Sequence, residues 1–323
     1  MKIYKKISLI TMAAMVISCS AENTDTPAAE EMAAAPAEAM TNAIPEGAQA
    51  ISLLGKTLIS APAGQKVIDD LAAAKAVYDA DPMDAQNIIW YGRRTAYTGE
   101  FLRAIEIFSE GVEKFPEDSR MYRHRGHRYI STRQFDKAIA DYEIAAKLIE
   151  GQEDSIEEDG APGPAGIPVS SKHSNIWYHL GLSYYLVHDW ENALKAYQTG
   201  HDLGVNDDNI VSTAHWIYMI HNRMGNPELA KAAIEHITAD MNVIENFSYH
   251  NLVLFYKGEI PPEEMLNVDP NDPSGAAVAY GVANWYLYND QPEKAYELME
   301  RFVATKSWAS FGFIAAEVEL MMK

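Results

Sequence analysis

A pattern of small and aromatic residues that recurs every 34 positions constrains this fold more than any other sequence feature. Gly92 and Gly126 stand 34 residues apart, and in that register Phe108 falls on Tyr142. A shift of 55 residues brings in a third copy, with Trp177, Leu180, Gly181, Tyr184, Trp190, Ala193, Tyr197 and Gly200. Small residues let two helices approach closely while aromatic side chains fill the space around them. Each copy is therefore predicted to be one pair of packed helices.

The third copy, NIWYHLGLSYYLVHDWENALKAYQTG, has the pattern W-x2-L-G-x2-Y followed by an alanine, an aromatic residue and a small residue. It resembles the tetratricopeptide repeat (TPR) family, in which each unit is a pair of antiparallel helices. The resemblance implies an all-α fold, a TPR-type α-solenoid whose helix pairs form a right-handed superhelix with a concave face. The solenoid is expected over residues 50–323, with units near 85–118, 119–150, 174–207, 209–240, 246–266 and 276–306 and a capping helix at 307–323.

The N-terminal sequence predicts export and lipidation. Residues 1–18 contain lysines, then a short apolar run, then small residues, which is the composition of a secretory signal peptide. They end in VIS before Cys19, the only cysteine of the chain, and VISC matches the lipobox of bacterial lipoproteins. Cys19 is the predicted lipidation site, with a chance cysteine in an ordinary signal peptide as the alternative. Residues 19–49, rich in alanine, proline and glutamate, are expected to form a disordered acidic tether.

The repeats and the lipobox together resemble the bacterial TPR lipoproteins of the outer membrane, which act as adaptors for envelope proteins. The resemblance implies a lipid-anchored protein of the bacterial cell envelope. Ser20 follows Cys19 where an aspartate would favour retention in the inner membrane, so the outer membrane is the expected location. Exposure to the periplasm and exposure on the cell surface both stay open.

The segment Arg120–Phe135, RMYRHRGHRYISTRQF, contains five arginines, two histidines and no acidic residue in a chain whose net charge is -20. At helical spacing one stripe carries Arg120, Arg123, His124 and His127. In TPR proteins this stripe faces the concave groove, and the neighbouring units add Arg93, Tyr178, His179 and Tyr185 to the same wall. These eight residues are the predicted binding groove, because arginine forks recognise carboxylate or phosphate groups.

The same arginines have a structural interpretation. An acidic, Pro/Gly-rich insertion is expected at residues 151–172, and six acidic residues between Glu150 and Asp159 could neutralise the arginines. A third possibility combines the two, with the acidic insertion occupying the groove until a partner displaces it. Arg125 stands where the family usually has a buried leucine, so it requires a buried partner, Asp136 or Asp141.

The predicted function is a scaffold or adaptor that binds a partner protein or peptide of the envelope. A receptor for a small anionic ligand or glycan fragment is the alternative. The acidic balance argues against nucleic acid as a partner. No catalytic motif, phosphate-binding loop or metal-ligand spacing accompanies the histidines, so we expect no enzyme activity, no cofactor and no metal.

The last helix has apolar residues outside its main stripe. Phe313 and Leu320 lie on the side opposite the stripe that includes Trp308 and Phe311. Either the apolar segment 51–59 covers them, or they form a contact between two copies of the chain. A homodimer through the C-terminal helix is therefore an open alternative.

Overall fold

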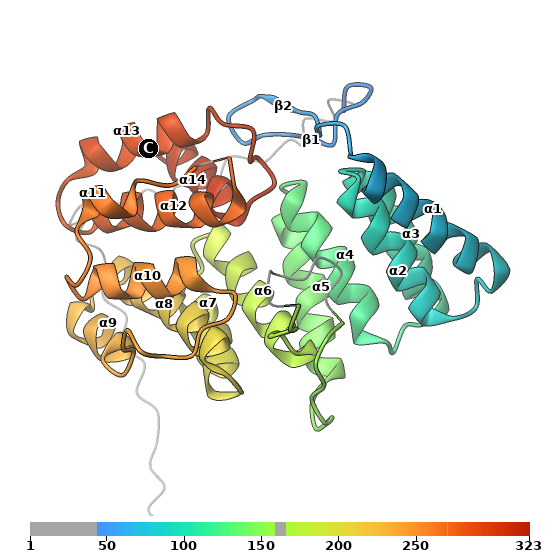
Figure 1. The fold of residues 1–323 in the computed structure, drawn as a ribbon, viewed down its shortest axis with the longest axis horizontal. Helices are drawn as coiled ribbons and strands as arrows, with labels where there is room; N and C mark the ends of the chain where they lie inside the picture. The colour runs from blue at the N-terminus through green and yellow to red at the C-terminus, as the bar shows by residue number, and fades with distance from the viewer. Residues whose placement is uncertain (1–43, 159–165, 270) are drawn as a thin grey trace, which may run out of the picture. The chain divides into compact units, whose positions relative to one another are not determined.

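The computed structural model describes residues 44–158, 166–269 and 271–323, and Figure 1 shows helices that follow one another in pairs. The predicted all-α class is confirmed. The predicted signal peptide at 1–18, the lipidation site Cys19 and residues 20–43 of the predicted tether lie outside the described residues. Among the described residues, none of the helices combines the length and the apolar character needed to cross a bilayer.

The described residues form one small hairpin and fourteen helices. Strands β1 (Ala50–Ile51) and β2 (Thr57–Leu58) pair antiparallel. The helices are α1 (Gln65–Ala80), α2 (Ala85–Tyr97), α3 (Phe101–Lys114), α4 (Ser119–Ser131), α5 (Phe135–Leu148), α6 (Lys172–Leu186), α7 (Trp190–Asp202), α8 (Asp207–Arg223), α9 (Pro227–Ile234), α10 (Phe247–Tyr256), α11 (Pro262–Met265), α12 (Pro273–Leu287), α13 (Pro292–Phe302) and α14 (Phe311–Met321).

Short polar side chains begin the first helix of most pairs. Each of them accepts a hydrogen bond from a backbone N–H of the first helical turn, where the helix itself supplies no acceptor. These residues are Asp84 before α2, Asp118 before α4, Ser171 before α6, Asn206 before α8 and Asp272 before α12. The sequence therefore specifies where each of these helices starts.

Inside the pairs, a glycine on the first helix faces an aromatic ring on the second. A Cβ built on Gly126 of α4 would lie 2.7 Å from the ring of Tyr142 on α5, and Tyr142 is fully buried. The same contact recurs between Gly92 and Phe108 and between Gly181 and Tyr197. The register predicted from the sequence is thus confirmed, and its cause is the close approach that only glycine permits.

Each turn within a pair contains a residue with positive φ. Glycine occupies it in three turns, at positions 99, 225 and 258. The other three turns have Arg133, His188 and Asp290, with φ of 63°, 57° and 56°. A side chain in the left-handed region costs about 1 kcal/mol or more, so retaining one there points to contacts that offset the strain.

Two of these turn residues hold the C-terminal helix. Arg133 Nε donates to Glu317 Oε2 of α14 at 2.8 Å, and His188 Nε2 lies 3.3 Å from Glu319 Oε1. Arg223 at the end of α8 donates to both oxygens of Glu319, at 2.9 and 3.0 Å. Both glutamates are buried. Helix α14 therefore packs back onto earlier pairs, instead of ending the array as a polar cap.

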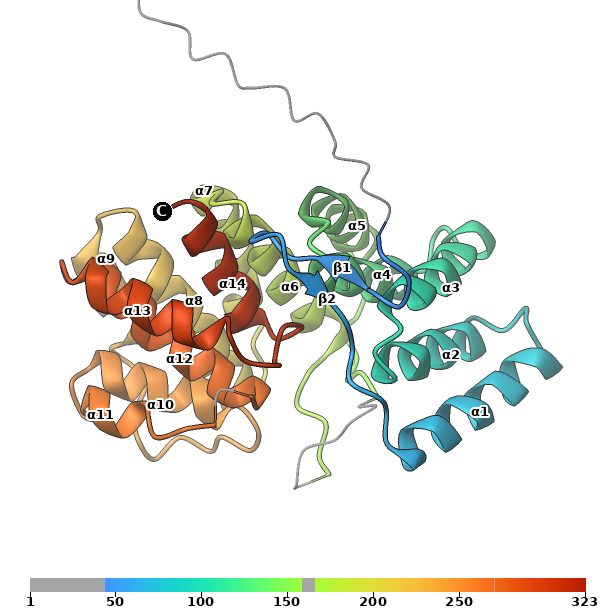
Figure 2. The ribbon, with the colours of Figure 1, turned by 90° about the horizontal axis from the view of Figure 1, so that it is seen from above.

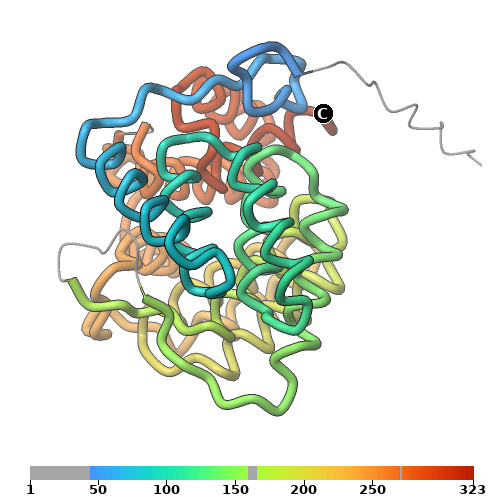
Figure 3. The backbone as a smooth tube through the Cα atoms, turned by 90° about the vertical axis from the view of Figure 1, so that its right-hand side faces the viewer, coloured from blue at the N-terminus to red at the C-terminus, as the bar shows by residue number. Residues whose placement is uncertain are grey.

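The apolar side chains of α14 are covered within the chain. Phe313 is 3% exposed and packs against Phe302 of α13 with ring centroids 5.6 Å apart. Phe313 is therefore covered within one chain and requires no second copy, which removes one of the two residues that suggested a homodimer. Ile59, which directly follows β2, contacts the loop before α14. Trp308 Nε1 donates to the Ile59 carbonyl at 3.0 Å, and Figures 2 and 3 show the blue hairpin beside the red C-terminal segment.

Candidate functional site

Three adjoining cavities lie along the first helices of successive pairs. The cationic cavity, of about 220 Å³, is lined by α2, α4, α6 and parts of the insertion at 151–172. The apolar cavity, of about 480 Å³, shares Tyr97 and His127 with the cationic cavity. The amide cavity, of about 220 Å³, shares Ser170 and Asn175 with it. The apolar cavity and the amide cavity share Tyr249 and Phe311, so each of the three cavities borders the other two.

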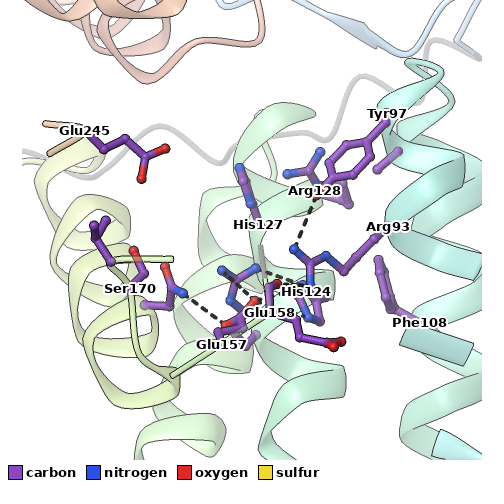
Figure 4. A pocket seen from close by; sticks show the side chains of 14 residues that line it. Arg93, Tyr97, Phe108, His124, His127, Arg128, Glu157, Glu158, Ser170 and Glu245 are labelled. Carbon is purple, nitrogen blue, oxygen red and sulfur yellow. Dashed lines mark hydrogen bonds and ion pairs between the residues drawn. The ribbon is translucent and has the colours of Figure 1, made fainter. Parts of the chain in front are cut away.

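The cationic cavity brings together half of the predicted groove residues, namely Arg93, Arg123, His124 and His127. Helical spacing explains this, because Arg93 projects from α2 while Arg123 and His124 lie one turn before His127 on α4. Figure 4 shows Arg93, His124 and His127 around the cavity, with Arg128 beside Tyr97. The prediction that these four side chains share one surface is therefore confirmed. Their role in binding stays a prediction.

The insertion places a carboxylate between two of the arginines. Glu157 Oε1 lies 3.2 Å from Arg123 Nη2 and 3.8 Å from Arg93 Nη1. Asn175 Nδ2 donates to its other oxygen at 3.0 Å, and the Glu158 carbonyl accepts from Arg93 at 2.8 Å. The dashed lines in Figure 4 trace this network. The insertion thus neutralises part of the arginine charge, as the structural interpretation expects.

Arg128 is a further arginine of this cavity, which the sequence reasoning missed. Its guanidinium lies 5.1 Å from the centre of the Phe101 ring, and its side chain makes no hydrogen bond or ion pair with any described residue. Burial lowers the pKa of Arg128 to about 10, so it stays charged at neutral pH. Arg128 follows His124 by four residues, so helical spacing could have placed it on the same stripe.

The histidines of the site are neutral at neutral pH. Burial is the main cause that lowers the pKa of His124 and His127, and neighbouring arginines lower it further. Burial also lowers the pKa of His179 to about 3, and its ring lies 4.9 Å from that of His127. The positive charge of the cavity therefore comes from arginines alone, and the carboxylates of Glu157, Glu158 and Glu245 also belong to its lining. No group of three metal-ligating side chains occurs among the described residues.

Two of the predicted groove residues lie elsewhere. Arg120 forms a fork on Asp118, the residue that caps its own helix, and lies outside the cationic cavity because this local partner is closer than the groove. Tyr185 is 1% exposed and its hydroxyl lies 2.7 Å from that of Tyr280, because α12 packs over this face of α6. Tyr185 is therefore not on an open groove wall, and Arg120 lies outside the cationic cavity.

The last two predicted residues line the amide cavity. His179 and Tyr178 stand beside the side chains of Asn175, Asn209, Ser212 and Thr213. The Tyr178 hydroxyl is already engaged, since it lies 2.7 Å from that of Tyr249 and accepts from Trp216 Nε1 at 2.9 Å. Tyr178 therefore contributes a ring rather than a free hydroxyl to this surface.

Arg125, which stands where the family usually has a buried leucine, has one of the two acidic partners predicted for it. Arg125 donates to both carboxylate oxygens of Asp141 on α5, at 2.8 and 2.7 Å. Asp141 is 4% exposed, so the pair is buried between the two helices. Of the two candidates, Asp141 is confirmed. Arg125 is thus structural and points away from the cationic cavity.

Comparison with known proteins gives structural likeness at low sequence identity. No protein-family model and no curated protein matches the sequence. The solved structure of YrrB, a TPR protein with an unusual peptide-binding site, is 17% identical with a TM-score of 0.42, covering 72% of this chain and 92% of its own. A structure of MamA is 16% identical with a TM-score of 0.41, covering 59% and 90%.

A kinesin light chain with TPR-like repeats from Podospora anserina is also similar, at 14% identity and a TM-score of 0.41, covering 69% of this chain and 94% of its own. Within this chain, consecutive helix pairs repeat one glycine–aromatic contact and stack in sequence order. The described chain is an all-α solenoid of TPR-type helix pairs.

Proposed function

We propose that this chain is a non-enzymatic scaffold that holds an acidic segment of a partner protein in the cationic cavity. The observation that carries the proposal is a cavity lined by three partly buried arginines, two of which already bind a carboxylate of the same chain. Arg128 retains its charge without an anionic partner among the described residues. Buried guanidinium groups favour carboxylate or phosphate ligands strongly, because little water competes for them.

The neighbouring cavities favour a peptide over a small anion. They border the cationic cavity and add apolar and amide-lined space to it, which suits a peptide with several side chains rather than a single small anion. The amide cavity offers asparagine and hydroxyl groups, which can hydrogen-bond peptide backbone groups of either polarity. The partner is therefore proposed to be an extended peptide segment with at least one carboxylate.

The proposed place of action is the bacterial cell envelope, with the chain anchored through a lipid on Cys19. The support is the signal-like composition of residues 1–18 and the VISC sequence at residues 16–19. Two acyl chains suffice for stable membrane attachment. We expect Cys19→Ala to move the protein from the membrane fraction to the soluble fraction of bacterial cells. Membrane retention of this variant would contradict the anchor, while Ser20→Ala serves as the neighbouring control.

We expect Arg123→Ala to lower the affinity for acidic peptides by about tenfold or more, because it removes one of the three positive charges that line the cationic cavity. Random short peptides would first be selected on the full chain, and the enriched acidic sequences measured by fluorescence anisotropy. Arg120→Ala is the matched control, since Arg120 lies on the same helix but is bound to Asp118. It should leave the affinity unchanged.

The converse variant is Glu157→Gln, which removes the internal carboxylate from Arg93 and Arg123. It should raise the affinity for the same peptides, whereas Glu153→Gln at an exposed position of the insertion should not. Equal affinities in wild type, Arg123→Ala and Glu157→Gln would reject the cationic cavity as the site. Stabilisation of the chain by phosphate or malate alone, lost in Arg123→Ala, would instead favour the small-anion receptor.

A further inference from the structure

The apolar cavity is a second recognition surface, which the proposed function leaves unused. Its walls are formed mainly by Phe101, Tyr249, Ala277, Trp308 and Phe311. These residues come from α3, α10, α12, α14 and the loop before α14, so the cavity exists only after the C-terminal helices have packed back. Its volume of about 480 Å³ lies within the range typical of ligand pockets.

The walls of this cavity are held rigidly. The Trp308 indole is 9% exposed, donates to the Ile59 carbonyl at 3.0 Å and packs edge to face on Phe101, with ring centroids 5.4 Å apart. Phe101 is 8% exposed. A preformed apolar surface loses little conformational entropy when a ligand side chain enters it, so burial of that side chain contributes to affinity almost in full.

The apolar cavity and the cationic cavity meet along one wall. Tyr97 and His127 line both of them, and the His127 ring lies 5.2 Å from that of Phe311. Arg128 lines the cationic cavity while its guanidinium covers the ring of Phe101, which lines the apolar cavity. A positive charge without an anionic partner among the described residues therefore stands at the border of an apolar pocket.

We propose that the partner segment carries a large apolar side chain close to its acidic residue, and that this side chain is buried in the apolar cavity while the carboxylate meets Arg128. The inference rests on the proposed function and specifies its ligand. Arg128 sets the orientation, because its guanidinium both lines the cationic cavity and covers a ring that lines the apolar cavity. The acidic and apolar groups must then follow each other at a short, fixed spacing in the partner sequence.

The test uses the same peptide selection on the full chain, followed by Ala277→Phe. Ala277 is partly exposed on α12 and lines the apolar cavity, so a phenyl group there fills space that the peptide side chain would take. Wild type should enrich peptides that combine Asp or Glu with Phe, Trp, Leu or Met at constant spacing. Ala277→Phe should lower the affinity for such a peptide by about tenfold or more. A peptide in which alanine replaces the large apolar residue should bind equally to wild type and to Ala277→Phe.

A second variant, Ala309→Phe, fills the cavity from the loop before α14 and covers the case in which Ala277→Phe does not fold. Enrichment of acidic residues without an apolar companion, or unchanged affinity in both folded variants, overturns the inference and leaves the proposed function standing. Absence of any acidic enrichment overturns the proposed function itself. Tighter peptide binding after deletion of residues 20–43 would show the chain's own N-terminal segment to be the occupant, and would also overturn the inference.

Discussion

Replacing Arg133 with alanine should lower the free energy of unfolding by about 3–5 kcal/mol. The ion pair of Arg133 with Glu317 is buried, with side chains 3% and 2% exposed, and Arg133 also donates to the Trp308 carbonyl at 2.7 Å. Burial lowers the pKa of Arg133, so desolvation already opposes its charge and the carboxylate is what offsets that cost. The substitution leaves Glu317 buried without its cation. Urea denaturation followed by far-UV circular dichroism measures the loss.

The matched control is Arg301→Ala, because Arg301 is an exposed arginine on α13. Its loss should change stability by less than about 0.5 kcal/mol. Alanine and arginine tolerate positive φ equally poorly, so the comparison isolates the side chain of Arg133 from the strain of its turn. Adding Glu317→Leu to Arg133→Ala should recover part of the stability. If Arg133→Ala lowers the free energy of unfolding no more than Arg301→Ala does, the Arg133–Glu317 ion pair does not hold α14 in place.

The second large effect is expected for Gly312→Ala, which should destabilise the chain by about 1–3 kcal/mol. A Cβ built at Gly312 would lie 2.3 Å from the Ala276 carbonyl oxygen and 2.7 Å from its carbon. These are backbone atoms of α12, so relief requires α14 to move away as a whole. Alanine normally stabilises a helix relative to glycine by about 1 kcal/mol, so a net loss shows that the overlap dominates.

Thermal unfolding of Gly312→Ala would be compared with Gly64→Ala, where an added Cβ meets nothing within 4 Å. The control should leave the melting temperature nearly unchanged. Because Phe311 precedes Gly312 and lines the apolar cavity, Gly312→Ala should also weaken apolar side-chain recognition. An unchanged melting temperature would mean that α14 sits less tightly on α12 than the geometry indicates.

Sequence reasoning succeeded where partners are close in the chain. Gly126 and Tyr142, and likewise Arg125 and Asp141, lie 16 residues apart on the two helices of one pair, so the repeat register places them together. The stripe that contains Arg123 follows from helical spacing alone. These are local relations, and the repeat pattern determines them.

The long-range contacts could not be predicted from the register. Arg133 and Glu317 are 184 residues apart, and Trp308 and Ile59 are 249 apart. A solenoid whose units touch mainly their neighbours gives no reason to expect either contact. Only the apolar character of segment 51–59 suggested that this segment meets the C-terminal helix. The assumption of contacts between neighbouring units alone also assigned Tyr185 to an open wall, although α12 covers it. The apolar cavity was missed for this reason too, since distant segments build it.

The anchoring of α14 by turn residues limits how this array can evolve. Open solenoids can gain or lose copies by duplication, because each copy interacts only with those beside it. Here Arg133, His188 and Arg223 reach the two glutamates of α14 from three successive pairs. Inserting or deleting one helix pair between these cations and the C-terminus would move the two carboxylates away from them. The carboxylates would then be buried without a cationic partner. The number of helix pairs is consequently constrained by these ion pairs as well as by packing.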